Sequence, residues 1–270
     1  MKRAIANFLI SREFQLSLFA PLLRWFVRRT RGAFRYTSSF LLDIQAIERP
    51  ACAYCMRKAA ILAKQLGVAR ISVLEFGAGE GSGLVFMRDF AVEMKKLFGV
   101  DIDCYGFADG VGRAAPESVK DLPYRYNPSQ KSAPATARLA EAGIIDGSFS
   151  ETIPKFLEQT SPAPIGAVFV NDETHAATSR VLKIFEGAAA RPDHFLPRIF
   201  LYLPYVTGTS AEMYGSFNGQ LAAVDEFNAV HDDAKIVANR NLAPLTHVNY
   251  RFHIFFAHLF KHPQYGSFVG

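Results

Sequence analysis

The chain has 270 residues, half of them hydrophobic, which suffices for one large α/β domain with a substantial core or for two small domains. Its formal charge of +5 is concentrated at the N-terminus: residues 1–35 hold eight of the 30 Lys and Arg residues but only one of the 25 acidic residues. The remaining chain, with 22 basic and 24 acidic residues, has no basic excess to neutralise phosphates, which argues against a nucleic-acid partner.

Residues 1–40 are predicted to be a basic amphipathic arm in front of a domain over residues 41–270. The longest mostly apolar section of the arm, residues 14–27, contains Pro21 and Arg24 and is too short and too interrupted to span a bilayer. Its arginines follow the apolar section, unlike those of a secretory signal peptide. Two interpretations stay open: a helix packed on its own domain, or a surface through which residues 1–35 contact an anionic membrane or another subunit, including a homodimer partner.

The three cysteines are too few, and odd in number, for a disulfide framework, and we expect a cytoplasmic protein, either free or peripheral at the inner face of a membrane. Cys52 and Cys55 form a CxxC pair at the start of "CAYCMRKAAILAKQLG", whose apolar residues recur at helical spacing. We therefore predict core cysteines of an amphipathic helix rather than a zinc or redox site.

The hydrophobic patterns after the arm predict alternating helices and strands. A helix is expected over residues 50–67, and a strand (70–77), a helix (84–99) and a strand (102–109) then form a βαβ unit. Residues 110–137 are predicted to be a long lid or binding loop. The later elements are a strand within 139–148, a helix over 150–159 capped by Ser150, a strand over 165–172, a helix over 178–189, a strand over 198–206, a helix over 219–231, and strands over 235–240 and 250–260. This order predicts a three-layer, doubly wound, seven-stranded Rossmann-like α/β sheet with an N-terminal helical extension.

The stretch "LEFGAGEGSG", residues 74–83, follows a buried strand with Gly77, Gly79 and Gly81 at alternate positions. These glycines allow a tight turn that a ligand can approach closely. In a dinucleotide fingerprint the third glycine would stand where this chain has Ser82, and Glu75 would repel a pyrophosphate. S-adenosylmethionine, which carries a sulfonium and an ammonium but no phosphate, fits an acid at this position better.

Ligands of open α/β sheets bind beyond the carboxyl ends of the strands, so residues at the predicted strand ends are the site candidates. Asp109 is predicted to accept hydrogen bonds from ribose hydroxyls, a role it would share in a nicotinamide enzyme. Phe149 is predicted either to pack on an adenine ring, with Asp146 or Ser148 at the adenine edge, or to be a core residue. The predicted cofactor contacts are Glu75, Gly77, Gly79, Gly81, Ser82, Asp109, Asp146, Ser148, Phe149 and Asn171.

The segment "VLEFGAGEGSG" resembles motif I of class I S-adenosylmethionine-dependent methyltransferases. Four later segments are similar, in the same order, to segments of the macrocin O-methyltransferase branch: "YGFADGVG", "GSFSETIP", "FVNDETHAATSRVLKIFE" and "LAAVDEFN". The resemblance covers roughly residues 41–260 and leaves the arm unexplained. It implies a class I methyltransferase fold, S-adenosylmethionine as cofactor, and O-methylation of a small molecule or a glycan hydroxyl.

The chain also departs from that branch, whose fourth strand ends in Asp-x-Asp and whose fifth ends in Asp-Asp, acids that hold magnesium. Here Asn171 and Glu173 take the first pair of positions, and the fifth strand ends "LYLPYV" without an acid. Because magnesium prefers several carboxylate ligands, we predict transfer without a metal. The branch's acid at the second strand is also displaced, since Ala108 stands in its place and Asp109 follows.

Methyl transfer to a hydroxyl requires alignment and a proton acceptor. His175 is the predicted general base and Asp172 the second choice, while a helix-start histidine bonded to backbone is the structural alternative for His175. His253 and His258 are predicted to be structural residues of an aromatic strand. The competing functions are a catalytically inactive methyltransferase-fold subunit and a nicotinamide-dependent oxidoreductase, the latter disfavoured by Glu75 and Ser82.

Overall fold

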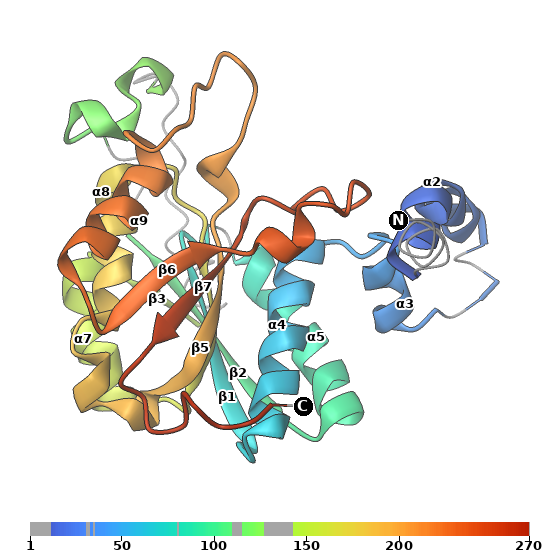
Figure 1. The fold of residues 1–270 in the computed structure, drawn as a ribbon, viewed down its shortest axis with the longest axis horizontal. Coiled ribbons are helices and arrows are strands. Elements are labelled where there is room, and N and C mark those ends of the chain that lie inside the picture. The colour runs from blue at the N-terminus through green and yellow to red at the C-terminus, as the bar shows by residue number, and fades with distance from the viewer. Residues whose placement is uncertain are drawn as a thin grey trace, which may run out of the picture.

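The computed structural model describes residues 12–30, 33–34, 36–79, 81–109, 115–126 and 143–269, and gives no side-chain placement for residues 12–18. Seven strands of this part form one sheet in the order β3-β2-β1-β4-β5-β7-β6, in which β7 runs antiparallel to β5 and β6 and the other neighbouring pairs are parallel (Figure 1). The strands are β1 (Arg70–Phe76), β2 (Asp101–Ala108), β3 (Ile144–Asp146), β4 (Ile165–Val170), β5 (Phe195–Tyr202), β6 (Ala234–Ala238) and β7 (Ile254–Leu259). The predicted seven-stranded doubly wound sheet is confirmed.

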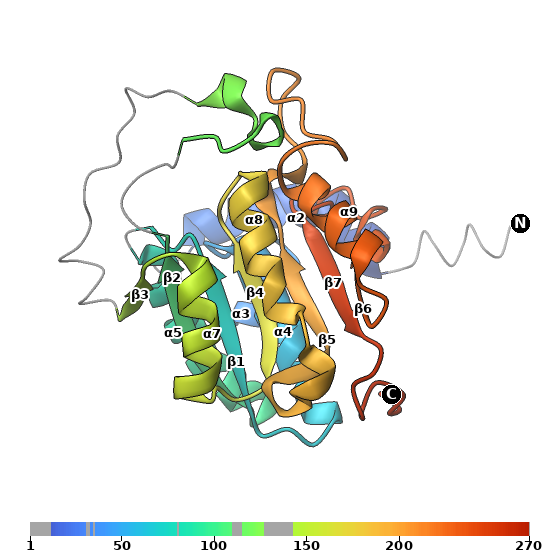
Figure 2. The ribbon, with the colours of Figure 1, turned by 90° about the vertical axis from the view of Figure 1, so that its left-hand side faces the viewer.

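Helices cover both faces of the sheet. α4 (Pro50–Gln65) and α5 (Ser82–Phe98) lie on one face, and α7 (Phe149–Thr160), α8 (His175–Leu182) and α9 (Gly219–Val230) lie on the other (Figures 1 and 2). Each face has its own buried apolar cluster, one built on α4 and α5 and one on α7, α8 and α9. This is the predicted three-layer arrangement, and it leaves the carboxyl ends of the parallel strands free for a site.

The CxxC pair lies inside α4. Cys52 and Cys55 are both free thiols in the core cluster on the α4 face. Burial raises the pKa of Cys52 to about 12 and raises the pKa of Cys55 well above its ordinary value. Both cysteines are buried residues of this amphipathic helix, so the prediction of core cysteines is confirmed.

Two predicted helix starts were wrong. α7 begins at Phe149, so its N-cap is Ser148, two residues before the predicted cap Ser150; the chain turns at Gly147, whose φ is +127°. α8 begins at His175 instead of residue 178, because the Thr174 side chain accepts a hydrogen bond from the Ala177 backbone and caps the helix there.

The predicted lid falls partly outside the described residues, which include only 115–126 of it. That segment contains the 3-10 helices η1 (Val119–Asp121) and η2 (Pro123–Arg125). Arg125 joins this segment to the rest of the domain by ion pairs. The Arg125 guanidinium lies 2.7 Å from a carboxylate oxygen of Glu212 and 3.5 Å from a carboxylate oxygen of Glu173. The role of this segment as a lid stays a prediction.

The basic arm contains α2 (Arg12–Thr30), with Pro21 inside it, and leads into α3 (Ser38–Asp43). One face of α2 is covered: Ala20 and Val27 have no exposed surface, and Arg24 and Arg28 line a cavity of about 520 Å³ shared with α3 and α5. Across the described residues, every helix is too short or too polar to cross a bilayer. The division of the chain at residue 40 stays a prediction.

Candidate active site

The glycine turn between β1 and α5 is built as the sequence predicted. Gly77, Gly79 and Gly81 all have φ between +53° and +83°, a backbone region that favours glycine. At Gly77 a Cβ atom would also stand 2.9 Å from the carbonyl oxygen of Asn171. At Gly79 no atom lies within 4 Å of the corresponding point, so the turn is open on that side.

Glu75 lies under the first turn of α5, and a fourth glycine makes room for it. A Cβ atom at Gly83 would stand 2.2 and 2.3 Å from the two carboxylate oxygens of Glu75. Glu75 is 1% exposed. Gly83 was not among the predicted site residues, although it stands in the quoted glycine stretch.

Two side chains donate to the same oxygen of Glu75. Arg49 Nη1 lies 3.1 Å from Oε1 and Asn171 Nδ2 lies 2.7 Å from it, while Arg49 Nη2 donates to Ser82 Oγ at 3.1 Å. The other oxygen, Oε2, is buried and accepts no hydrogen bond from the described residues. Burial raises the pKa of Glu75, and Arg49 and Asn171 oppose that rise. A buried carboxylate with one unused oxygen fits a cationic donor.

Sequence analysis missed Arg49. It stands at the N-cap of α4, 26 residues before Glu75, in no motif that indicates a site. Only the packing of α4 against the sheet brings its guanidinium to the end of β1.

Glu75 and Arg49 line a cavity of about 730 Å³ at the carboxyl ends of β1, β4 and β5. β1 and β4 are adjacent, and their following helices, α5 and α8, cover opposite faces, so this is the topological switch point of the sheet (Figure 2). Besides the glycine turn and the start of α4, the wall includes Asn171, Tyr202, Tyr205, Tyr250 and His253. The cavity therefore joins the predicted methyl-donor turn to a wall of phenol rings and one imidazole.

His253 contributes a neutral imidazole to that wall. It lies one residue before β7, so the prediction that it is a residue of the last strand was wrong by one position. Its Nε2 lies 2.5 Å from Thr207 Oγ1, and its ring centroid lies 6.4 Å from that of Tyr202. Burial, and then the charge of Arg251, lower the pKa of His253 below its ordinary value, so the ring is uncharged at neutral pH and able to accept a proton.

The predicted ribose contact, Asp109, lies at the end of β2 beside α8. Its carboxylate is 3.5 Å from Arg180 Nη1, and burial raises the pKa of Asp109 against the effect of that guanidinium. Asp109, Asp121 and Asp172 border a small hollow of about 30 Å³. Asp109 is thus not among the residues that line the larger cavity with Glu75.

The remaining cofactor candidates at the end of β3 have mixed surroundings. Asp146 and Ser148 are exposed. Phe149 is fully buried, with its ring edge-on to Phe76 at a centroid distance of 5.2 Å. Core packing accounts for Phe149, the second of its two predicted roles, and an adenine contact of these residues stays a prediction.

The predicted catalytic pair lies outside the lining of the 730 Å³ cavity. His175 Nε2 is 2.7 Å from a Glu226 oxygen on α9. Asp172 Oδ1 accepts hydrogen bonds from the Thr174 backbone at 2.8 Å and from the Thr174 hydroxyl at 2.7 Å, which shapes the entry into α8. Their roles as base stay predictions.

The residues at the positions of the predicted metal acids have other surroundings in the structure. The Glu173 carboxylate, at the position of a predicted metal acid, faces Arg125, and β5 is followed by Leu203 and Pro204. The described part of the chain holds no group of three or more His, Cys, Asp or Glu side chains placed to share an ion. Metal-independent transfer itself stays a prediction.

The chain matches no protein-family model and no curated protein. Among solved structures it is similar to the calicheamicin methyltransferase CalS11 (14% identity, 92% of this chain and 93% of that chain covered, TM-score 0.48). It is also similar to the O-methyltransferase TomG from Streptomyces achromogenes, solved in complex with SAM (14% identity, 86% and 94% covered, TM-score 0.39). A third is the plantazolicin methyltransferase BamL (11% identity, 81% and 87% covered, TM-score 0.35). The chain itself has a seven-stranded Rossmann-like α/β fold, and its chemistry has to be inferred from its own residues.

Proposed function

We propose that this protein is an S-adenosylmethionine-dependent methyltransferase that acts on a hydroxyl of a small molecule or a glycan. The observation that carries the proposal is the buried carboxylate of Glu75, held beneath the glycine turn beside Arg49 at the edge of the 730 Å³ cavity. A carboxylate and a guanidinium side by side complement the ammonium and carboxylate of a free amino-acid group. A pyrophosphate offers no cation to Glu75.

Glu75 and Arg49 would hold the methionine end of the cofactor, and the open turn at Gly79 would let its sulfur approach the backbone. Ser82 and Asn171 stay proposed contacts, whereas the Asp109 carboxylate already faces Arg180 and its predicted ribose contact needs a separate test. When bound, the cofactor supplies a methyl group on a sulfonium, which is activated for in-line attack.

We infer that His253 accepts the proton of the acceptor hydroxyl. It is uncharged at neutral pH, it lines the same cavity as the glycine turn, and its Thr207 partner is itself a hydroxyl, the group that an acceptor would present. His175, the general base predicted from the sequence, does not line this cavity and pairs with Glu226. The two histidines are therefore competing candidates that one assay can separate.

The first experiment is calorimetric titration of the full chain with S-adenosylhomocysteine, S-adenosylmethionine and NAD, followed by a screen for transfer of labelled methyl groups to sugars and phenols. Micromolar binding of the first two ligands, weakened in Glu75→Gln, supports the proposal. Preference for NAD would identify a nicotinamide enzyme. Cofactor binding without transfer to any acceptor would favour the alternative of a catalytically inactive binding subunit.

A further inference from the structure

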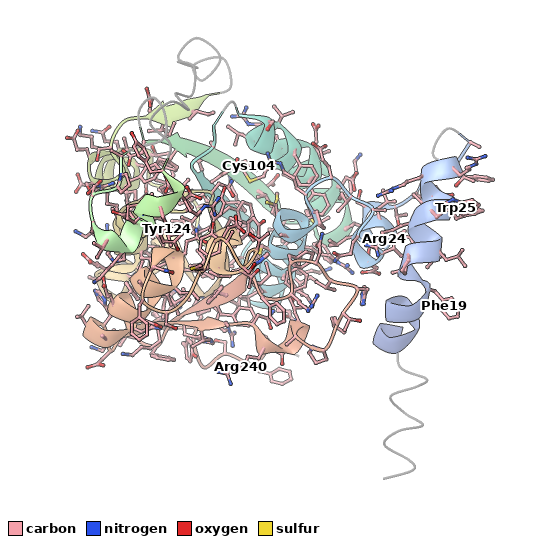
Figure 3. All side chains as sticks on the ribbon, turned by 90° about the horizontal axis from the view of Figure 1, so that it is seen from above. Phe19, Arg24, Trp25, Cys104, Tyr124 and Arg240 are labelled. Atoms are coloured by element: carbon pink, nitrogen blue, oxygen red, sulfur yellow. The ribbon has the colours of Figure 1, made fainter. Side chains whose placement is uncertain are left out.

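α2 presents two unlike faces. Ala20 and Val27, on the side toward the domain, have no exposed surface, whereas Phe19, Leu22, Trp25 and Phe26 are 54%, 62%, 61% and 49% exposed. Figure 3 shows Phe19 and Trp25 directed away from the domain and Arg24 on the side toward it. We call the four exposed residues the outer face of α2. Large apolar side chains gathered on one exposed helix face indicate an interaction surface.

The charge of α2 indicates which kind of partner the outer face can bind. Arg28 and Arg29, both exposed, stand in the last turn next to Trp25 and Phe26, and by helical spacing Arg29 falls on the outer face. The sequence has no acidic residue between Glu13 and Asp43, so nothing in that stretch neutralises these arginines. Arg24 and Arg28 border the cavity that Glu48, Asp89 and Glu93 also line, away from the outer face.

A second copy of the chain fits the outer face poorly. In a two-fold pairing the same patch meets itself, which would bring the arginines of both copies together without an acid between them. An anionic bilayer offers phosphates to the arginines and an interfacial region to the aromatic rings, which is where Trp and Phe of in-plane helices lie.

We propose that the outer face of α2 docks in the plane of an anionic phospholipid bilayer, with Phe19, Leu22, Trp25 and Phe26 at the headgroup boundary and Arg29 on a lipid phosphate. The buried Ala20 and Val27 are not part of the outer face, so docking of that face leaves them covered and needs no unfolding of the arm. This surface is independent of the proposed methyl transfer: either can be wrong while the other holds.

The test uses the full chain and a natural reporter, because Trp25 is the only tryptophan. Vesicles of phosphatidylcholine containing 30% phosphatidylglycerol should shift the Trp25 emission to shorter wavelength, protect it from acrylamide and pellet the protein. Vesicles of phosphatidylcholine alone should bind at least tenfold more weakly, and 0.5 M NaCl should release the bound protein.

Three variants make the test specific. Leu22→Glu with Phe26→Glu should abolish pelleting, and Arg29→Gln should weaken it about fivefold. Phe217→Glu, which adds one negative charge at a 91% exposed phenylalanine in the loop before α9, should bind like the wild type. Circular dichroism and thermal unfolding of each variant must match the wild type, so that lost binding reports the surface and not the fold.

Several results would overturn the proposal. Absence of an emission shift and of pelleting with anionic vesicles would do so, as would equal binding to neutral vesicles. A mass of two chains, with Trp25 emission that already depends on protein concentration in vesicle-free buffer, would assign the outer face to a second copy instead.

Discussion

The carboxyl end of β1 and the carboxyl end of β2 lie at the same edge of the sheet, and both carry an acid that the sequence marks as a site residue. At β1, Glu75 borders a cavity of about 730 Å³ and keeps one carboxylate oxygen without a hydrogen bond from the described residues. At β2, Asp109 borders a hollow of about 30 Å³ and faces Arg180, which also contacts Glu117. The position of an acid at a strand end thus makes it a candidate ligand-binding residue. The hydrogen bonds and ion pairs that its carboxylate already makes decide whether it is available to a ligand.

The largest expected effect is on turnover, and it compares a histidine that lines the Glu75 cavity, His253, with one that does not, His175. His253→Ala should lower turnover of an identified acceptor about 100-fold, since a general base contributes on the order of 10²–10⁴-fold, and leave the affinity for S-adenosylhomocysteine within about twofold. His175→Ala, which removes a side chain paired with Glu226, is the matched control and should stay within about threefold of wild-type turnover. The reverse result would restore His175 as the base and reduce His253 to a wall residue.

The next effect concerns the space above Glu75. Gly83→Ala places a Cβ about 2 Å from both Glu75 oxygens, so Glu75 and Arg49 must move; we expect affinity for S-adenosylhomocysteine to fall about 30-fold and stability to fall by about 1–3 kcal/mol. Gly266→Ala is the control, because no atom lies within 4 Å of its would-be Cβ. Calorimetry and thermal unfolding measure the two quantities. Wild-type affinity in Gly83→Ala would show that the Glu75–Arg49 arrangement is not the binding site.

A smaller pair of effects compares the two acids directly. Glu75→Gln keeps the shape but removes the charge, and should weaken S-adenosylhomocysteine binding about tenfold, or about 1.4 kcal/mol. Asp109→Asn should change it less than about threefold, because the Asp109 carboxylate is already paired with Arg180. If calorimetry finds equal losses, the ribose role predicted for Asp109 stands and Arg180 must move on binding.

The smallest effect is on pH dependence. Burial lowers the pKa values of His247, His253 and His258. Above about pH 6.5, the ordinary histidine pKa, these rings are neutral in both states; below it the unfolded chain takes up protons that the folded chain does not, so the free energy of unfolding should fall. Urea unfolding at pH 7.5 and 5.5 measures this loss, which should be smaller in His253→Gln. An identical loss in both proteins would mean that the His253 pKa is not lowered.

The sequence by itself determined where the strands and the glycine turn lie along the chain, because hydrophobic periodicity and glycine positions are local signals. It identified all seven strands and the turn of Gly77, Gly79 and Gly81, and it assigned Cys52 and Cys55 to a helix core. Its errors at the starts of α7 and α8 came from single residues: the left-handed turn at Gly147 and the cap at Thr174.

Only the tertiary structure decided which strand-end residues meet. Arg49 and Asn171 reach Glu75 from 26 and 96 residues away, and no spacing rule connects positions that far apart. The packing of the helices on the sheet also places Phe149 in the core against Phe76 and His175 beside Glu226. It places His253 in the wall of the cavity. The physical reason is that periodicity sets which face of an element is buried, whereas the partners of a polar side chain depend on how separate elements pack together.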